Sequence, residues 1–169
     1  QLLSAYHLAF SQNGCNFSVP GAGKTSIVYG AYTYLKNTSD ASKKVDKILI
    51  IGPLSSFGPW ENEYEECFGV KVRSQRMSGK LSAAQKKQYF YGRTAELTLL
   101  SYQSVITLKD ELEYFLRNNQ VMVVLDEAHK VKSTNGGIIA NIVMDLSKWC
   151  SSRVILTGTP APNGYEDLY

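Results

Sequence analysis

The sequence contains no long run of apolar residues, which excludes one whole class of protein. None of its stretches approaches the roughly 18 consecutive apolar residues of a membrane-spanning helix. Its first residues, QLLSAYHLAF, lack the basic region and the cleavage site of a secretory signal. We therefore expect a soluble protein of the cytoplasm, or of the nucleus in a eukaryote, with no membrane partner.

Cysteine is also scarce. The three cysteines, Cys15, Cys67 and Cys150, are odd in number and far apart in the chain. Neither a disulfide framework nor a structural zinc site has this spacing. We expect reduced thiols buried in the core, and no structural metal. The sequence lacks internal repeats and low-complexity segments as well, so a repeat architecture is not expected.

What is present suits one α/β domain. A chain of 169 residues that is 44% apolar is long enough to bury a substantial core. Apolar runs bounded by turn residues alternate with helix-like stretches, which predicts a mainly parallel sheet with helices on both faces. Strands are expected at 16–19, 47–53, 70–74, 96–102, 121–127 and 153–160. Helices are expected at 2–12, 24–36, 58–68, 82–91, 109–118 and 137–148.

Residues 18–25, SVPGAGKT, have the composition of a phosphate-binding loop. Gly21 and Gly23 allow backbone N–H groups to turn toward phosphate oxygens. Lys24 brings positive charge to the terminal phosphates, and the Thr25 hydroxyl can coordinate Mg²⁺. The helix that begins here adds the positive end of its dipole. Taken alone, the loop is also compatible with a tight strand-to-helix turn that binds nothing.

A second motif follows about a hundred residues later. In VMVVLDEAH, residues 121–129, five apolar residues lead to Asp126 and Glu127 at the end of a predicted buried strand. The pair could be two solvated carboxylates. Unpaired charges at the edge of a core are costly, however, and a bound metal ion would compensate for them. One carboxylate then serves the metal and the other a water molecule. The two motifs together predict a site for ATP and Mg²⁺.

The net charge of +3 is small, but the cations are unevenly distributed. The stretch 71–95 contains no acidic residue. Its cations are Lys71, Arg73, Arg76, Lys80, Lys86, Lys87 and Arg93, with Tyr89, Phe90 and Tyr91 among them. Such a stretch could follow a phosphate backbone, or it could be a solvated helix face and loop. Both interpretations stay open at this point.

Longer segments carry a family resemblance. Residues 50–69, 98–105, 125–133 and 156–169 occur in the order typical of superfamily 2 helicase-like ATPases. They resemble the Swi/Snf-type branch most closely. The discriminating residues are Pro53, Leu54, Ser55, Trp60, Glu63, Lys132, Pro162 and Asn163. The resemblance implies that 1–169 is the N-terminal RecA-like lobe, a P-loop NTPase fold, of a longer chain with a second such lobe. Proteins of this branch usually translocate along double-stranded DNA without separating its strands.

The resemblance also assigns roles to residues. The nucleotide loop is Ser18, Pro20, Gly21, Ala22, Gly23, Lys24 and Thr25. Catalysis falls on Lys24, Asp126 and Glu127, with Thr25 and Asp126 holding Mg²⁺ and Glu127 orienting water. Coupling between the nucleotide and the nucleic acid falls on His129, Thr157, Gly158 and Thr159. Contacts to the phosphodiester backbone fall on Pro53, Leu54, Ser55, Ser101 and Tyr102.

Two further positions bear on the resemblance. Gln1 lies 23 residues before Lys24, about where similar proteins have a glutamine that reads adenine. Val19 and Pro20 replace the acidic, Met-Gly-Leu-type approach that is common in Swi/Snf motors. This difference suggests a divergent, microbial or phage, subgroup. Taken by itself, Trp60 is expected to be a core residue rather than part of a site.

The leading hypothesis is an ATP-dependent DNA translocase or helicase-like ATPase. One alternative is a non-catalytic scaffold that binds nucleic acid in a nucleotide-dependent way. A second is a P-loop kinase, which would explain the loop but not the segments around Trp60 and Thr157. In the resembling family a second lobe supplies an arginine that stabilises the transition state. The isolated chain is therefore expected to bind ATP weakly and to hydrolyse it poorly.

Overall fold

The computed structural model describes residues 1–11, 13–18, 21–129 and 137–158. They form a six-stranded, all-parallel sheet in the order β1-β6-β5-β2-β4-β3. The strands are β1 (Asn13–Asn16), β2 (Lys47–Gly52), β3 (Ser74–Met77), β4 (Leu97–Ser101), β5 (Val121–Asp126) and β6 (Ser152–Leu156). The helices are α1 (Leu2–Ser11), α2 (Lys24–Asn37), the 3₁₀ turn η1 (Leu54–Ser56), α3 (Phe57–Phe68), α4 (Ala83–Tyr91), α5 (Tyr102–Thr107), α6 (Lys109–Asn118) and α8 (Ile138–Ser147). No helix of the described residues is long and apolar enough to span a bilayer.

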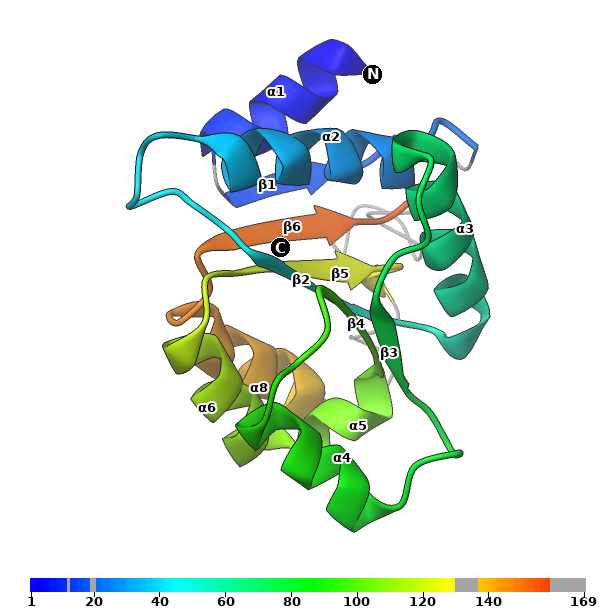
Figure 1. Ribbon diagram of the computed structural model, residues 1–169, viewed down its shortest axis with the longest axis vertical. Helices are drawn as coiled ribbons and strands as arrows, with labels where there is room; N and C mark the ends of the chain where they lie inside the picture. The colour runs from blue at the N-terminus through cyan, green and yellow to red at the C-terminus, as the bar shows by residue number, and fades with distance from the viewer. Residues whose placement is uncertain (12, 19–20, 130–136, 159–169) are drawn as a thin grey trace.

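Helices cover both faces of the sheet (Figure 1). Helices α2 and α3 lie on one face, with α1 packed against α2, while α4, α5, α6 and α8 lie on the other. Strand β2 shows how the sequence fills both layers. Ile48 and Ile50 join the core beneath α2, and Leu49 and Ile51 join the core on the opposite face. This alternation explains why the apolar run of β2 is continuous, as expected for a parallel strand buried on both sides.

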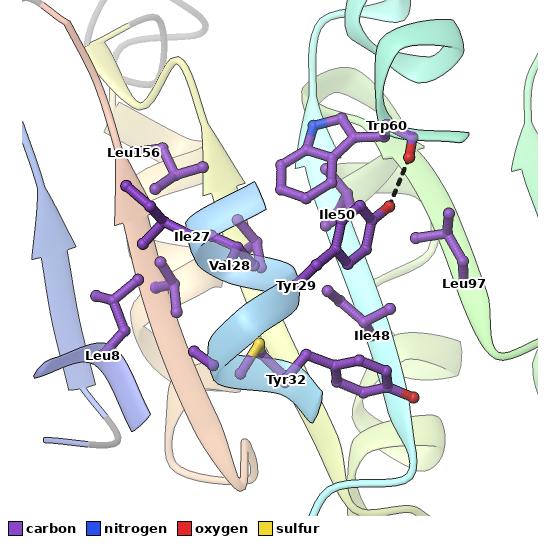
Figure 2. Packing of buried hydrophobic residues seen from close by; sticks show 14 of the residues in the cluster. Leu8, Ile27, Val28, Tyr29, Tyr32, Ile48, Ile50, Trp60, Leu97 and Leu156 are labelled. Atoms are coloured by element: carbon purple, nitrogen blue, oxygen red, sulfur yellow. Dashed lines mark hydrogen bonds between the residues drawn. The ribbon is translucent and has the colours of Figure 1, made fainter. Parts of the chain in front are cut away.

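Helix α2 is fixed on the sheet by large buried side chains (Figure 2). Val28, Tyr29 and Tyr32 are each at most 1% exposed. Tyr29 meets the Trp60 ring edge to face, with 5.4 Å between ring centroids, and its hydroxyl donates to the Trp60 carbonyl at 2.6 Å. The helix that follows the glycine loop is therefore locked to α3 as well as to the strands.

The six predicted helices are confirmed, and each boundary lies within one residue of its predicted place. Their local signals are strong. Helix α4, for example, begins with a capping box in which the Ser82 side chain accepts from the Gln85 N–H and the Gln85 side chain accepts from the Ser82 N–H. Helix α5 was not predicted. The expected strand at 96–102 ends one residue early, and Tyr102 begins that short helix instead.

The two edge strands were predicted at the wrong positions. Strand β1 covers Asn13–Asn16 rather than 16–19, and β3 covers Ser74–Met77 rather than 70–74. Strand β1 consists of small and polar residues, NGCN, so it has no alternation of apolar and polar residues by which it could be predicted. Near β3 the alternation of Val70 and Val72 misled the prediction, because Val70 is 58% exposed and the pairing with β4 begins only at Ser74.

The prediction for the cysteines is only partly correct. Cys15, Cys67 and Cys150 are free thiols, but Cys15 and Cys67 are exposed and only Cys150 is half-buried. Cys15 lies on edge strand β1, where one face is left open, and Cys67 lies on the outer side of α3. Burial raises the pKa of Cys150 to about 12, so its thiol stays protonated at neutral pH.

The central strand gives a stability prediction. Ile50→Ala should destabilise the protein by about 2 to 5 kcal/mol, because it removes a fully buried side chain and leaves a cavity. Ile138→Ala is the matched control, since Ile138 is 53% exposed, and should change stability by less than about 0.5 kcal/mol. Urea unfolding followed by circular dichroism measures both. Equal midpoints for the two variants would contradict this account of the core.

Candidate nucleotide-binding site

The carboxyl ends of the strands bring the predicted motifs together. The parallel register pairs Gly52 with Ser101, Asp126 with Leu156, and Asn16 also with Leu156. The segments that follow β1, β2, β4, β5 and β6 therefore leave the sheet at one edge. Ligands bind at this edge in open α/β sheets. Topology thus unites residues that are separated by more than a hundred positions in the sequence.

The glycine loop leads directly into α2. Gly21 and Gly23 both have left-handed backbones, with φ of 81° and 72°, and Gly23 is the N-cap residue of α2. Lys24 and Thr25 form the first turn of the helix and are half-buried, as is Ala22. The Lys24 ammonium donates to the Ser18 carbonyl at 3.0 Å. That bond uses one of its three protons, and two donors remain for phosphate oxygens. Pro20 lies outside the described residues.

Gln1 lies beside the glycine loop. A Cβ atom on Gly23 would overlap the side-chain nitrogen of Gln1. The Gln1 carbonyl accepts from the Ala5 N–H at 2.9 Å, which ties its backbone to the first turn of α1. The amide is therefore next to the loop that is predicted to hold the phosphates. Its proposed role in reading adenine stays a prediction.

Asp126 is held by two aromatic residues. The Trp60 indole N–H donates to Asp126 Oδ2 at 3.0 Å, and the Tyr102 hydroxyl donates to the Asp126 carbonyl at 2.7 Å. Gly52 leaves room for this arrangement, because a Cβ atom there would lie 3.0 Å from Asp126 Cβ. Burial, together with the nearby Asp126 and Glu127 carboxylates, raises the pKa of Tyr102 far above its usual value. The hydroxyl consequently stays a hydrogen-bond donor at neutral pH.

Glu127, directly after the strand, has a strained backbone. Its φ of 54° is the one positive value found for a non-glycine residue in the described part of the chain. Such a conformation costs about 1 to 3 kcal/mol and is typical of functional sites. One Glu127 carboxylate oxygen lies 3.4 Å from His129 Nδ1, and that nitrogen lies 3.0 Å from Thr157 Oγ1. The Ala128 N–H donates to the Leu156 carbonyl at 3.0 Å. The turn after β5 is thus tied to the end of β6.

The oxygen donors at this edge fit Mg²⁺. The Thr25 hydroxyl and the Asp126 carboxylate are hard ligands of the kind that Mg²⁺ prefers. Within residues 1–11, 13–18, 21–129 and 137–158, no group of three or more His, Cys, Asp or Glu side chains could hold a metal. Mg²⁺ typically takes one or two protein ligands and completes its shell with water and substrate phosphates. A nucleotide-dependent Mg²⁺ site suits this donor set.

The segments predicted to touch nucleic acid lie at the same edge, but their exposure differs. Leu54 is 61% exposed, Ser55 is exposed and Pro53 is half-buried. Ser101 caps α5, because its side chain accepts from the Ser104 N–H.

Tyr102 is only 6% exposed and its hydroxyl is bonded to Asp126. In the structure the Tyr102 side chain therefore supports Asp126. Its contact with a phosphodiester backbone stays a prediction.

The family assignment follows from sequence comparison. The model of the family described as 'SNF2-related domain' matches residues 10–169 of this chain. The chain belongs to the SNF2-related family. This assignment confirms the resemblance to Swi/Snf-type ATPases that the motifs indicated.

Individual relatives of this SNF2-related chain are much longer. The mouse DNA excision repair protein ERCC-6-like is 30% identical over 156 residues, which cover 88% of this chain and 12% of that protein. The chromatin-remodeling ATPase INO80 of Mycosarcoma maydis is 29% identical over 166 residues, 93% of this chain and 8% of that protein. The crystal structure of the UvsW helicase from bacteriophage T4 matches with a TM-score of 0.64 and 18% identity, over 98% of this chain and 55% of that one. This structural match confirms the fold.

The loop glycines of this SNF2-related chain give a second prediction. Gly21→Ala should cost about 1 to 2 kcal/mol, because its left-handed backbone disfavours a side chain while the surrounding space is open. Gly23→Ala should cost more, since the new methyl group also displaces Gln1. Adding Gln1→Ala to Gly23→Ala should recover part of that difference in urea unfolding. No recovery would show that Gln1 does not rest on the loop.

Tyr102 gives a third prediction. Tyr102→Phe should destabilise the protein by about 1 to 3 kcal/mol, because the Asp126 carbonyl loses its donor inside the structure. Tyr114→Phe is the control, since Tyr114 is 44% exposed, and should change stability by less than about 0.5 kcal/mol. Thermal and urea unfolding measure both variants. A neutral Tyr102→Phe would mean that this hydrogen bond contributes nothing to the site.

Proposed function

We propose that this chain is the ATP-binding lobe of an ATP-dependent DNA translocase or helicase-like ATPase. It hydrolyses ATP with Mg²⁺ to move along nucleic acid or to remodel it. One observation carries the proposal: the Lys24 loop and the Asp126–Glu127 pair leave the sheet at the same edge, after β1 and β5. Membership of the SNF2-related family supports the same activity.

The residues divide the chemistry among themselves. Lys24 and the loop N–H groups bind the phosphates, and Thr25 and Asp126 hold the metal. Mg²⁺ supplies charge neutralisation at the phosphate oxygens when it is bound. Glu127 orients and polarises the water that attacks the γ-phosphorus in line. The bond from that phosphorus to the β,γ-bridging oxygen breaks, and ADP, inorganic phosphate and a proton are released. His129 contacts Glu127 and Thr157, which suits a role in coupling hydrolysis to the nucleic acid. Gly158 is half-buried beside Thr157, and Thr159 lies outside the described residues.

A second lobe completes the proposed enzyme. The chain spans 12% and 8% of the two curated relatives described above, and 55% of the UvsW chain. In phosphoryl transfer an arginine supplied in trans can stabilise the charge of the transition state. We assign that arginine to a second RecA-like lobe of the same protein. The isolated 169-residue chain should then bind ATP weakly and turn it over slowly.

We propose that double-stranded DNA lies across the protein surface next to η1, at the carboxyl ends of the strands. A hollow of about 390 Å³ lies between η1, α3 and β3, and Leu54, Ser78 and Lys80 contribute to its lining. It therefore joins the exposed segment after β2 to the basic stretch 71–95. Arg76 and Lys87 are paired with Glu61 and Glu111.

Other cations of the stretch are available for phosphates. Among the residues that the structure describes, no carboxylate pairs with Lys71, Lys80, Lys86 or Arg93. Contacts of this kind position a duplex without reading its sequence. ATPase rates of the whole protein with duplex DNA, single-stranded DNA, RNA or no polymer test the choice of partner.

Glu127→Gln in the whole protein tests the catalytic assignment. It should lower kcat by about 10² to 10⁴, because the amide cannot polarise the attacking water as a carboxylate does. Nucleotide binding should persist, whereas Lys24→Ala should weaken it. Glu113→Gln is the matched control, since Glu113 pairs with Arg117 on the surface of α6, and should leave turnover unchanged.

Steady-state hydrolysis and equilibrium binding of a fluorescent ATP analogue separate these effects. Unchanged turnover in Glu127→Gln would favour a nucleotide-dependent scaffold, or a different general base. A phosphorylated small-molecule acceptor in the reaction products would favour a P-loop kinase instead.

A further inference from the structure

Trp60 is more than a core residue. Its side chain is 1% exposed, yet its indole N–H does not pack among apolar groups alone but donates to Asp126 Oδ2. Trp60 lies on α3, after β2, whereas Asp126 ends the neighbouring strand β5. A buried N–H that lost this acceptor would bear a full desolvation penalty. The hydrogen bond therefore constrains the carboxylate as well as the indole.

The same indole is tied to the helix that begins at the phosphate-binding loop. Tyr29, five residues after Lys24 on α2, donates its hydroxyl to the Trp60 carbonyl at 2.6 Å and contacts the ring edge to face (Figure 2). A second bond joins the same two helices, from the Ser26 hydroxyl to Glu63. Trp60 consequently lies between the start of α2 and the carboxylate at the end of β5.

This geometry leaves one carboxylate oxygen available. The terminal torsion of an aspartate has a broad, roughly two-fold distribution, so an unsupported carboxylate can rotate. Because Trp60 donates to Oδ2, that oxygen has a fixed partner, and Oδ1 accepts none of the hydrogen bonds described above. Mutation of groups that orient a metal-binding side chain in this way typically lowers metal affinity or activity by about 10- to 100-fold.

We propose that Trp60 is a positioning residue for the metal-binding carboxylate: its indole N–H holds Asp126 in the orientation that binds Mg²⁺, in register with the phosphate-binding loop. The inference rests on the proposed function, because it requires a nucleotide-dependent Mg²⁺ site at Asp126. It adds a role for a residue that was expected from the sequence to pack in the core and that helps to distinguish the family.

The test removes the N–H group and measures metal dependence. Trp60→Phe, and replacement of Trp60 by 3-benzothienylalanine, an isostere with sulfur in place of the indole N–H, are made in the whole protein. A fluorescent, non-hydrolysable ATP analogue is bound while Mg²⁺ is titrated. The Mg²⁺ concentration that gives half-maximal binding should rise by about 10-fold or more in both variants. Nucleotide affinity without Mg²⁺ should stay unchanged.

Trp149→Phe is the matched control. Trp149 follows α8, near Ser151, whose N–H bonds to Val121 at the start of β5, the end opposite Asp126. Its indole N–H is buried and has no hydrogen-bond partner within the described ranges. The control should leave the Mg²⁺ requirement unchanged. In an Asp126→Asn background, Trp60→Phe should add little further effect if the indole acts through that carboxylate.

The outcomes separate the two proposals. If the unmodified protein binds no nucleotide, or if Lys24→Ala does not weaken binding, the proposed function fails. If nucleotide binding is intact but the isostere keeps the original Mg²⁺ requirement, the role of Trp60 is wrong and the proposed function stands. Equal loss of binding with and without Mg²⁺ in the isostere would also overturn it, because that result signals a general structural role. Where Trp60→Phe does not fold, the isostere alone decides.

Discussion

The rest of the site depends on how the backbone carbonyl and the side chain of Asp126 are held. Strand β5 is paired on both sides, with β2 and β6, so its direction is fixed up to this residue. Tyr102 then holds the Asp126 carbonyl and Trp60 holds its carboxylate. The next residue, Glu127, turns into the left-handed region, which carries its carboxylate away from the sheet and toward His129. Two adjacent acids thereby acquire different surroundings, as their different proposed tasks require.

Asn16 connects the glycine loop to the segment after β6 by hydrogen bonds. It ends β1 and is 7% exposed. Its side-chain oxygen accepts from the Ser18 N–H and hydroxyl, at 3.0 and 2.5 Å, while its carbonyl accepts from the Thr157 N–H at 3.3 Å. The loop that carries Lys24 therefore starts from a residue that also binds the segment after β6. Thr157 in turn contacts His129, so the segments after β1, β5 and β6 form one connected hydrogen-bonded group.

The sequence was most informative where one local signal dominates. The strands β2 and β5 were predicted correctly, because a parallel strand that is buried on both faces has a continuous apolar run. The edge strands β1 and β3 were predicted at the wrong positions. A strand that is paired on one side only does not need a continuous apolar run, and the alternation of Val70 and Val72 was misleading because Val70 is exposed. Motif spacing indicated Lys24 and Asp126. It could not show that Trp60 and Tyr102 donate to Asp126, since these contacts link residues 66 and 24 positions apart.

These contacts also connect the segments proposed to touch nucleic acid with the residue proposed to bind the metal. The exposed segment around Leu54 runs directly into α3, which carries Trp60. Ser101 caps α5, whose first residue is Tyr102. Each segment proposed to lie along DNA is thus continuous with a residue that donates one hydrogen bond to Asp126. One short covalent path and one hydrogen bond thus link each segment to Asp126, to its carboxylate through Trp60 and to its carbonyl through Tyr102. Contiguous contacts of this kind can carry energetic coupling between two sites, which double-mutant cycles measure.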